Sequence, residues 1–501
     1  MSRPLPTHVD ALVVGSGFSG LASAIRLQEA GRQVVVVEKG HDVGGTWCVN
    51  TYPACACDVP SHLYSFSFAP NPEWTRTFSP QPEIYAYLRG VAERYGVHDR
   101  TWFGTELLDA AWDEGATRWA VRTSAGELTC DVLVLGTGGL SEPSTPAVKG
   151  LESFQGTTFH SATWDHDHDL TGKRVAVIGT GASSIQFAPE VAKVASHTTV
   201  FQRTAPWILP RRDRAITGLE RRLFRRFPGL QKVARGGIYG VREASVLGFS
   251  FQPAIMKLGE KQARRFIAAT VKDPVTREKV TPSYRMGCKR VLLSNTWYPM
   301  LNRSDVSLVT DGIEEVTATG VVTRDAAGQR VEHPVDTIIL GTGFSVSDPP
   351  VAHRVRGRDG STLYEAWTGG VGMAAYRGLT VPGFPNLFYL VGPNTGLGHT
   401  SIVFIIERQV EHMVKALRAM DAAGVAAIEP RADVTAAYDA WVQRRLQGTV
   451  WNAGGCASWY LDANGRNSTL WPTFTFTYAK ELRAFDLGDY ELTEQPVTAA
   501  A

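Results

Sequence analysis

The stretch Ala11-Leu12-Val13-Val14-Gly15-Ser16-Gly17-Phe18-Ser19-Gly20 decides the fold of the N-terminal region. Its four apolar residues predict a buried parallel strand, and the apolar spacing of residues 21–30 predicts the helix that follows. The first glycine permits a tight turn, the second lets a pyrophosphate approach the backbone, and the third lets the helix pack on the strand. Glu38, after a second apolar strand at residues 34–37, can accept hydrogen bonds from a ribose. Together these features predict a dinucleotide site with its phosphates at the helix N-terminus.

A second site of this kind follows the apolar residues 174–178. It reads Gly179-Thr180-Gly181-Ala182-Ser183-Ser184-Ile185-Gln186. Ser184 replaces the third glycine and is small enough to keep helix and strand close. The next predicted strand, residues 198–201, ends in Gln202-Arg203-Thr204 instead of an acid. Because Arg203 with Thr204 suits a 2′-phosphate, the sequence predicts a preference for NADPH over NADH.

Composition limits the alternatives. The chain has 501 residues, of which 44% are hydrophobic, so we expect two or three domains. The formal charge of +2 gives no chain-wide field for nucleic acid or membrane. The first residues lack the apolar core of a secretion signal, and no apolar run spans a bilayer. Six cysteines do not make a disulfide framework. We therefore expect a cytoplasmic protein with neither a nucleic-acid nor a membrane partner.

Two further patterns lie beside these sites. The segment Phe154-Gln155-Gly156-Thr157-Thr158-Phe159-His160-Ser161-Ala162-Thr163-Trp164-Asp165 has no metal-ligand spacing and no nucleophile–base pair, and no metal is expected elsewhere. The other pattern is Gly44-Gly45-Thr46-Trp47, then Tyr52-Pro53, then Asp58. With the two dinucleotide sites, these patterns resemble the type I Baeyer–Villiger monooxygenases over nearly the whole chain. That family depends on FAD and NADPH. His160 and Trp164 then form either a packed hinge or a direct functional contact, and the resemblance favours a linker that couples domain motion.

The resemblance also implies a catalytic pair. Lys289-Arg290 resembles the family's key dipeptide, in which the first residue contacts the NADP phosphate and the second reaches the flavin. Arginine suits that place because it stays charged and presents a planar fork of donors. Asp58 is implied to hold Arg290 by a charge-assisted bond. The alternatives are a surface pair before a strand for Lys289-Arg290 and a loop cap for Asp58.

Other contacts are implied by position. Residues Gly45, Thr46 and Trp47 belong to the FAD loop, Tyr64 touches the flavin, and the backbone of Leu107 meets the adenine end. Trp459, in the glycine-rich loop 454–465, is implied to fold over NADP. Two residues depart from the family pattern. Ala54 stands where glycine or methionine is usual, and Asp462 stands where glycine is common.

The expected fold class is α/β, with two Rossmann-like dinucleotide-binding domains and a helical insertion. The FAD-binding domain is expected at residues 1–145 and 346–501, ending in a lid loop, and the NADP-binding domain at residues 146–210 and 285–345. The insertion occupies residues 211–284. Its arginines suggest either a solvated helical face, which we favour, or nucleic-acid binding; they are Arg211, Arg212, Arg214, Arg221, Arg222, Arg225 and Arg226.

The implied activity is oxidation of a ketone to an ester or lactone by NADPH and O2 through a C4a-peroxyflavin. A sulfur or nitrogen oxygenase is the alternative within the class, but Trp164 and Arg290 argue against it. A disulfide reductase would need a C-x-x-x-x-C pair, whereas Cys48, Cys55 and Cys57 are spaced by seven and two and are expected to be packing thiols. A non-catalytic FAD-binding or redox-sensing protein is the third alternative, and the second dinucleotide site and Lys289-Arg290 argue against it.

Overall fold

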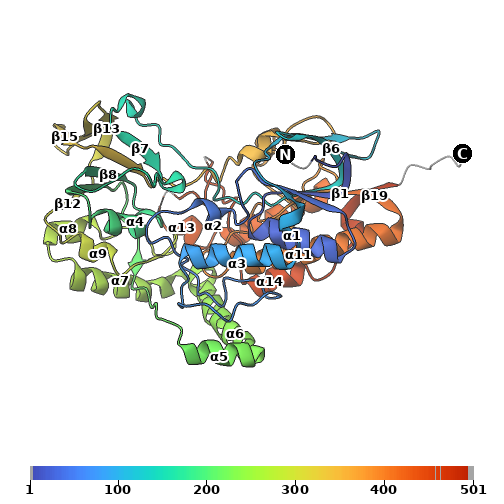
Figure 1. The fold of residues 1–501 in the computed structure, drawn as a ribbon, viewed down its shortest axis with the longest axis horizontal. Helices are drawn as coiled ribbons and strands as arrows, with labels where there is room; N and C mark the ends of the chain where they lie inside the picture. Colours follow the sequence, from blue (N-terminus) through green and yellow to red (C-terminus); the bar gives the residue numbers. More distant parts are fainter. Residues whose placement is uncertain (1–3, 457, 463, 495–501) are drawn as a thin grey trace, which may run out of the picture.

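The computed structural model describes residues 4–456, 458–462 and 464–494, and two largely parallel sheets organise it (Figure 1). The strands of the larger sheet are β1 (His8–Val14), β2 (Val34–Val37), β3 (Thr101–Trp102), β4 (Leu107–Asp113), β5 (Arg118–Thr123), β6 (Gly126–Leu135), β17 (Val355–Arg356) and β18 (Leu387–Tyr389). Their order is β17-β4-β5-β6-β1-β2-β3, and β18 pairs with β6. Since β2 lies on one side of β1 and β6 lies on the other, the topology switches between β1 and β6.

Three helices pack together beside the larger sheet (Figure 1). They are α1 (Phe18–Glu29), α3 (Gln81–Arg94) and α11 (Ile402–Ala423), and α1 contacts both of the others. The longest of the three is α11. Ser401 caps its start by accepting from the Val403 N–H, and Gly424, at a φ of +69°, ends it.

The smaller sheet is entirely parallel. Its strands are β7 (Thr157–His160), β8 (Arg174–Ile178), β9 (His197–Phe201), β12 (Val306–Val309) and β16 (Thr337–Leu340). Their order is β12-β9-β8-β16-β7, so the topology switches between β8 and β16. One face carries α4 (Ser184–Val191) and α9 (Trp297–Met300). The other carries an antiparallel sheet of β13 (Gly312–Val316), β14 (Gly320–Arg324) and β15 (Arg330–Pro334), whose Val316 and Val321 join the core under β8.

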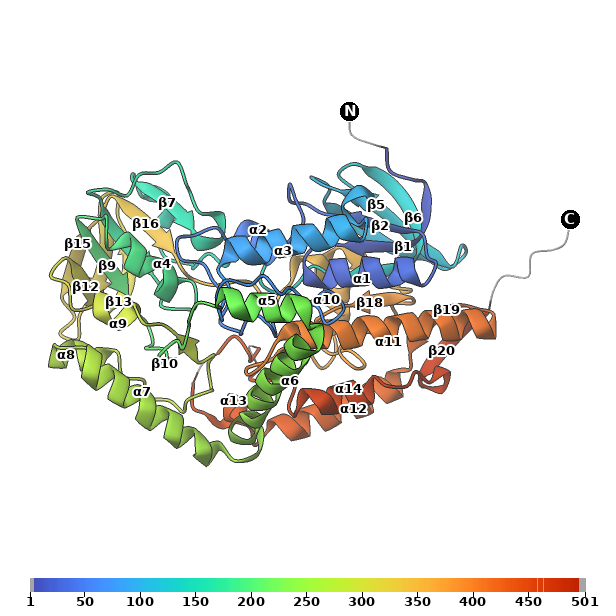
Figure 2. The same cartoon turned by 60° about the horizontal axis from the view of Figure 1, so that its bottom comes forward.

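The helical insertion leaves and re-enters the smaller sheet through two short parallel strands, β10 (Ile208–Leu209) and β11 (Leu292–Leu293). Its helices are α5 (Gly218–Arg226), α6 (Pro228–Ala244), α7 (Met256–Thr270) and α8 (Pro274–Lys279). Figure 1 shows α5 and α6 projecting below the body of the molecule, and Figure 2, in which this side comes forward, shows them in front of it. One face of α6 still reaches the larger domain, because Arg235 Nη1 donates to the carbonyls of His62 and Ser65, each at 2.9 Å.

The remaining elements are short or C-terminal. They are α2 (Thr46–Val49), α10 (Leu363–Thr368), α12 (Ala432–Leu446), α13 (Val450–Ala453), α14 (Thr475–Glu481) and the antiparallel pair β19 (Val425–Pro430) and β20 (Tyr490–Glu494). Within the described ranges, no helix has the length and apolarity needed to cross a bilayer.

Candidate active site

The first glycine-rich turn lies at the switch point of the larger sheet and has no room for side chains. Gly15 has a φ of +93°, and a Cβ on Gly20 would lie 1.8 Å from the Gly15 carbonyl oxygen. Gly17 faces Gly45, at 3.6 Å from an added Cβ to the Gly45 Cα. The helix α1 begins without a side-chain cap or an acidic residue in its first turn, and the buried Ser19 belongs to that turn. These residues fit a pyrophosphate, which needs close backbone approach and free N–H groups.

Glu38 stabilises this turn from the end of β2. Its Oε2 accepts from the backbone N–H and the hydroxyl of Ser16, at 2.8 and 2.7 Å, and its Oε1 accepts from the Gly40 N–H at 2.7 Å. A carboxylate offers about four acceptor positions, so one remains for the ribose hydroxyl that the sequence predicts.

The second glycine-rich turn, at the switch point of the smaller sheet, uses a different residue to bring helix and strand together. Gly179 has a φ of +106°, and an added Cβ would lie 2.4 Å from the Gly341 carbonyl oxygen. Ser184 is fully buried, and its Oγ would lie 1.9 Å from a Cβ on Gly341. Ser184 therefore does fit the third glycine position, because Gly341 lacks a side chain. The other predicted residues of this turn lie beside it and lead into α4: Thr180, Gly181, Ala182, Ser183 and Ile185.

A cavity of about 260 Å³ opens at the end of β9. Arg203, Thr204 and Lys279 line it, together with Thr281 and Ser283. Neither Arg203 nor Lys279 forms an ion pair within the described part of the chain. Lys289 lies close enough that Arg203, in addition to burial, lowers the pKa of its ammonium group. Cations without anionic partners fit a 2′-phosphate.

The predicted bond between Asp58 and Arg290 is present. Arg290 Nε donates to Asp58 Oδ2 at 2.7 Å and Nη2 donates to Oδ1 at 2.6 Å, a bidentate ion pair. Burial alone would raise the pKa of Asp58, but Arg290 more than offsets it and the pKa is lowered. Asp58 in turn raises the pKa of Arg290. Arg290 Nη1 has only a 3.5 Å contact with the Leu397 carbonyl, so one donor remains available.

Arg242 is a residue of this site that the sequence patterns did not identify. It lies on α6, and its Nη2 donates to the Asp58 carbonyl at 3.1 Å. Burial lowers the pKa of Arg242, and the charge of Asp58 opposes this. Its spacing of seven residues from Arg235 would have placed both on one face of α6, which was a usable signal for a buried polar face.

Two predicted FAD-loop aromatics contact each other beside Asp58. Trp47 Nε1 donates to the Tyr64 hydroxyl at 3.1 Å, and the Tyr64 ring meets Phe18 edge-on at 5.1 Å. Burial raises the pKa of Tyr64 above its ordinary range. Thr46 begins α2 directly after Gly45, so these residues form one compact unit around the first turn.

Gln186, predicted to bind NADP, engages the FAD-side loop with its side chain. Its Oε1 accepts from the Ala56 N–H at 3.1 Å and from the Tyr52 hydroxyl at 3.3 Å, and its Nε2 donates to the Ala56 carbonyl at 3.0 Å. The amide therefore joins the two dinucleotide-binding regions. Ala54 in this loop has a φ of +62°, which explains why glycine is suited to its position.

Leu107 and Trp459, predicted to contact FAD and NADP respectively, have different surroundings. Leu107 is buried at the start of β4, where its carbonyl accepts from Arg354 Nη1 at 2.6 Å. Trp459 is 48% exposed and lies 4.5 Å from the Tyr460 ring, so its indole is free to cover a ligand. Residues 457 and 463 of the same loop lie outside the described residues.

The cysteines separate into two groups. Cys48, Cys55 and Cys57 are free and buried, as expected of packing thiols, and Cys130 is free and buried as well. Burial raises the pKa of Cys55 to about 11. Cys288 and Cys456 form a disulfide across 168 residues of sequence. The expectation that the cysteines make no disulfide framework therefore missed one bond. Spacing could not reveal it, since only the fold brings Lys289-Arg290 next to the lid loop.

His160 and Trp164 are packing residues in the described structure. His160 is buried, its Nδ1 accepts from the Ala162 N–H at 3.0 Å, and its ring lies 5.9 Å from Phe344. The Trp164 ring packs on Phe159 and Phe187 at 5.2 and 5.3 Å. Of the two interpretations of this segment, the contacts favour the packed hinge.

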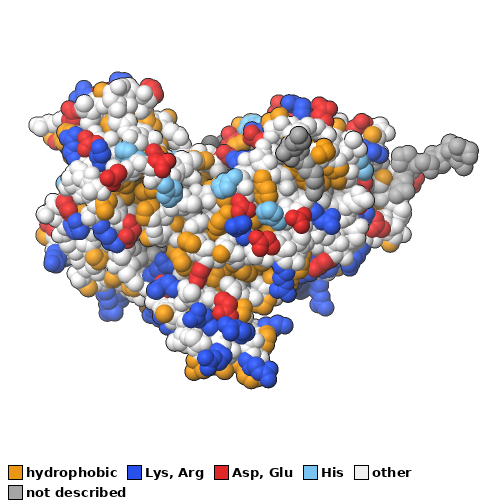
Figure 3. All heavy atoms as spheres, in the orientation of Figure 1, with side chains coloured by type: hydrophobic (Ala, Val, Ile, Leu, Met, Phe, Trp, Pro, Cys, Tyr) orange, Lys and Arg blue, Asp and Glu red, His pale blue; other side chains and the backbone are white. Residues whose placement is uncertain are grey.

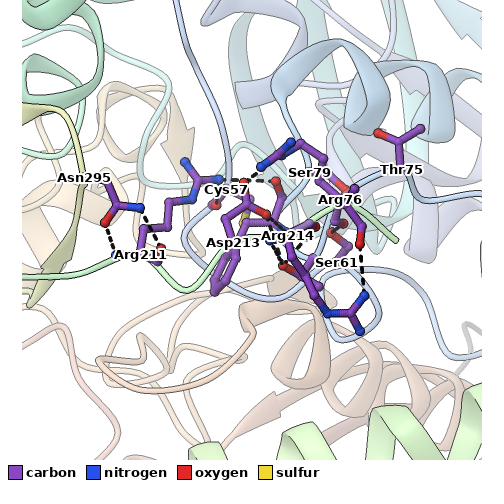
Figure 4. A network of polar contacts seen from close by, with 12 residues as sticks. Cys57, Ser61, Thr75, Arg76, Ser79, Arg211, Asp213, Arg214 and Asn295 are labelled. Carbon is purple, nitrogen blue, oxygen red and sulfur yellow. Dashed lines mark hydrogen bonds and ion pairs between the residues drawn. The ribbon is translucent and has the colours of Figure 1, made fainter. Parts of the chain in front are cut away.

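The expected solvated face of arginines is only partly correct. Arg211 is half-buried and donates to the carbonyls of Cys57 and Phe78 at 3.3 and 3.2 Å, while Asn295 bonds its backbone (Figure 4). Asp213 accepts from Arg76 Nε at 2.7 Å in the same network. This start of the insertion thus fixes the FAD-side loop. Only four of the seven arginines lie on α5, which begins at residue 218.

Comparisons with known proteins agree with this arrangement. The profile of the pyridine nucleotide-disulphide oxidoreductase family matches residues 12–217. A Baeyer-Villiger monooxygenase of Pseudomonas aeruginosa is 49% identical, over 99% of this chain and 94% of its own. One from Streptomyces coelicolor is also 49% identical, over 97% and 93%. The solved structure of OTEMO in complex with FAD and NADP has a TM-score of 0.87 at 28% identity, over 97% and 99% of the two chains. The chain belongs to the Baeyer–Villiger monooxygenase family.

Proposed function

We propose that the protein oxidises a ketone to an ester or lactone, with FAD as its bound cofactor and NADPH and O2 as co-substrates. The observation that carries this is the bidentate Asp58–Arg290 pair, in which each dinucleotide-binding region contributes one residue. When bound, FAD supplies the redox and oxygen-transfer chemistry, with NADPH as reductant.

The proposed roles of the other residues follow from the two turns. Residues of the first turn and its loop bind FAD: Gly15, Gly17, Ser19, Gly20, Glu38, Gly45, Thr46, Trp47, Tyr64 and Leu107. Residues of the second turn and of the cavity bind NADPH: Thr180, Gly181, Ala182, Ser183, Ser184, Ile185, Arg203, Thr204 and Lys289. Ala56 and Tyr52 engage the side chain of Gln186, so only its backbone is left for the proposed contact with NADPH. Trp459 would cover bound NADP.

Arg290 supplies positive charge where negative charge develops on oxygen. Arg290 pairs with the Asp58 carboxylate and Arg242 donates to the Asp58 backbone carbonyl, so these three residues keep an excess of one positive charge. Two unit charges about 4 Å apart gain about 1 kcal/mol in bulk water but about 4 kcal/mol at a protein-like dielectric. Asp58 fixes two of the three guanidinium nitrogens, and Nη1 is left to donate to the reacting oxygen. The side chains of Arg290 and Asp58 are 33% and 22% exposed, so the bound cofactors would have to complete the exclusion of water from this cluster.

The test is Arg290→Ala, with Arg303→Ala as the matched control, since Arg303 pairs with Asp305 on the surface. Arg290→Ala should keep reduction of bound FAD by NADPH under anaerobic conditions, measured by stopped-flow absorbance. It should lower the yield of ester or lactone, measured by gas chromatography over a ketone panel, by about 100-fold or more. Arg303→Ala should leave both unchanged. A normal ester yield from Arg290→Ala would overturn the proposal.

We also propose the division into an FAD-binding domain (1–145 and 346–501), an NADP-binding domain (146–210 and 285–345) and an insertion (211–284). In support, the two crossing segments bond to each other: the Ser144 N–H donates to the Gly343 carbonyl at 2.9 Å, and the Ser345 N–H donates to the Glu142 carbonyl at 3.0 Å. Brief proteolysis that first cuts outside residues 141–150 and 341–350 would contradict the crossings.

A cytoplasmic location is proposed because NADPH is regenerated there, and cell fractionation tests it.

A further inference from the structure

The insertion carries a strong local charge that the total charge of the chain conceals. Residues 218–270 contain eleven Lys and Arg but three Glu, a formal charge of +8, whereas the whole chain carries +2. Of those three acids, Glu220 pairs with Arg214, Glu260 with Arg285, and Glu243 is buried against His399. Several cations therefore form no ion pair within the described ranges. They are Arg222, Arg226, Lys232, Lys257, Lys261 and Arg265.

The same segment exposes an unusual amount of apolar surface. Of the nineteen large apolar side chains that are exposed among the described residues, ten lie between Leu219 and Leu258. Val233 and Val241 on α6 are 74% and 76% exposed, and Leu219 on α5 is 65% exposed. Scattered apolar residues are normal on a surface, but a concentration of this kind marks an interaction site.

Helical geometry puts these side chains on the outer sides of α5 and α6. On α6, Gln231, Arg235 and Arg242 contact the FAD-side loop, so Val233 and Leu230 point away from the protein. On α5, Phe224 packs on His62 at 4.9 Å. Leu219, Leu223, Arg222 and Arg226 share the opposite face.

We define the docking face as the apolar residues Leu219, Leu223, Leu230, Val233 and Val241 with the cations Arg222 and Arg226. Figure 1 shows that α5 and α6, which carry it, project from the body, and Figure 3 shows basic and apolar side chains gathered around α5. No other element covers it in the described structure.

We propose that the docking face binds reversibly to the surface of an anionic lipid bilayer. An amphipathic helix with Lys and Arg beside an exposed apolar stripe lies in the headgroup region, where the stripe enters the acyl boundary and the cations meet anionic headgroups. The total charge of +2 predicted no membrane partner. The concentration of positive charge on residues 218–270 changes that expectation.

Two other occupants fit the face less well. A second copy of the chain would bring two segments of +8 together, and like charges repel. Nucleic acid would meet the cations of α5, but the outer side of α6 offers it Leu230, Val233 and Val241, which gain nothing from a phosphate backbone.

The test is cosedimentation of the FAD-loaded full-length protein with vesicles. Phosphatidylglycerol mixed with phosphatidylcholine should bind the protein, pure phosphatidylcholine should bind it far less, and high salt should release it. Arg222→Gln/Arg226→Gln should weaken binding about 30-fold, at about 1 kcal/mol per charge. Val233→Asp/Val241→Asp should abolish it.

Matched controls are Arg444→Gln and Val371→Asp, which change an exposed cation and an exposed valine outside the insertion. Both should bind vesicles as the unmodified protein does, and all variants should keep their FAD content and ketone oxidation. Three results would each overturn the proposal. They are equal binding to neutral vesicles, a dimer in sedimentation velocity that Val233→Asp/Val241→Asp dissociates, and tighter binding to duplex DNA than to anionic vesicles.

Discussion

At the first dinucleotide turn, the close contact between helix and sheet joins backbone to backbone, whereas at the second turn it joins a side chain to backbone. Gly20 packs on the carbonyl of Gly15, and a Cβ on Gly136 from the neighbouring strand end would lie 2.9 Å from the Gly20 nitrogen. Ser184 takes the place of Gly20 in the second turn, and Gly341 makes room for its Oγ. The space that the motif requires can therefore be provided by either partner of the contact.

The two turns differ in charge as well. Glu38 is largely satisfied by the N–H and O–H groups of Ser16 and by Gly40, so the first site is locally compensated. At the second site, Arg203 and Lys279 have no anionic partner in the described ranges, and Lys289 lies near Arg203. The second site therefore carries uncompensated positive charge, as the proposed contact with a 2′-phosphate requires, and the first site does not.

The largest difference between the two turns is expected when alanine replaces the residue at the third glycine position, Gly20 in the first turn and Ser184 in the second. Gly20→Ala places a Cβ where the Gly15 carbonyl cannot move, so the variant should lose bound FAD and fail to fold normally. Ser184→Ala removes only a hydroxyl that has no hydrogen-bond partner among the described residues, and the free energy of unfolding should change by less than about 1 kcal/mol. Flavin absorbance of the purified proteins and thermal unfolding measure both. Equal FAD content in Gly20→Ala and Ser184→Ala would contradict this difference between the two turns.

A double-mutant cycle tests whether Gly341 makes room for Ser184. Gly341→Ala should destabilise the protein by about 1–3 kcal/mol through overpacking, because its Cβ would meet the Ser184 Oγ. Adding Ser184→Gly should recover most of that loss. The same cycle cannot work at Gly136, where the obstacle is the backbone of Gly20. Additive effects in chemical denaturation would contradict the coupling.

The charge difference is tested through coenzyme choice. Arg203→Ala should raise the KM for NADPH by about 10–100-fold, the loss expected for one charge-assisted contact, and leave the KM for NADH nearly unchanged. Steady-state NADPH and NADH oxidation measure it. Arg418→Ala, an exposed arginine on α11, is the control and should alter neither value. A matching rise in both KM values would show that Arg203 does not contact the 2′-phosphate.

The pH dependence of NADP binding should report on Lys289. Burial and Arg203 lower the pKa of Lys289, and its charged form binds phosphate, so affinity should fall as the pH rises through that lowered pKa. Arg203→Ala removes the repulsion and should move the midpoint of this fall to higher pH. Isothermal titration with NADP across the alkaline range measures it. A midpoint that moves to lower pH would contradict the assignment.

The smallest effect is expected in the loop that joins the two regions. Ala54 has a φ of +62°, so Ala54→Gly should relieve strain and raise the free energy of unfolding by about 1 kcal/mol. The control is Ala116→Gly, which lies in a turn without a positive φ at that residue and should be neutral or destabilising. Denaturant midpoints decide between these outcomes, and equal shifts in the two variants would contradict the strain at Ala54.

Local patterns predicted those parts of the structure that depend on neighbouring residues in the sequence. Both glycine turns and the strands beside them follow from periodicity and from residues that permit special backbone angles. The Asp58–Arg290 bond came from family resemblance, because 232 residues separate the two. Arg242, the Gln186–Ala56 contact and the Cys288–Cys456 bond were missed for one physical reason. Each joins elements whose proximity exists only after α6, α4 and the lid loop have packed.

The disulfide also affects how a proteolytic cut between Cys288 and Cys456 would be detected. Cys288 and Cys456 close the intervening chain into a ring, and the exposed turn between β14 and β15, at residues 325–329, lies inside it. A protease that cuts there would leave two pieces held by one covalent bond. Such a protein would run as a single band on a denaturing gel without reductant and as two bands with it. Apparent intactness on the first gel would therefore not show that the backbone is continuous.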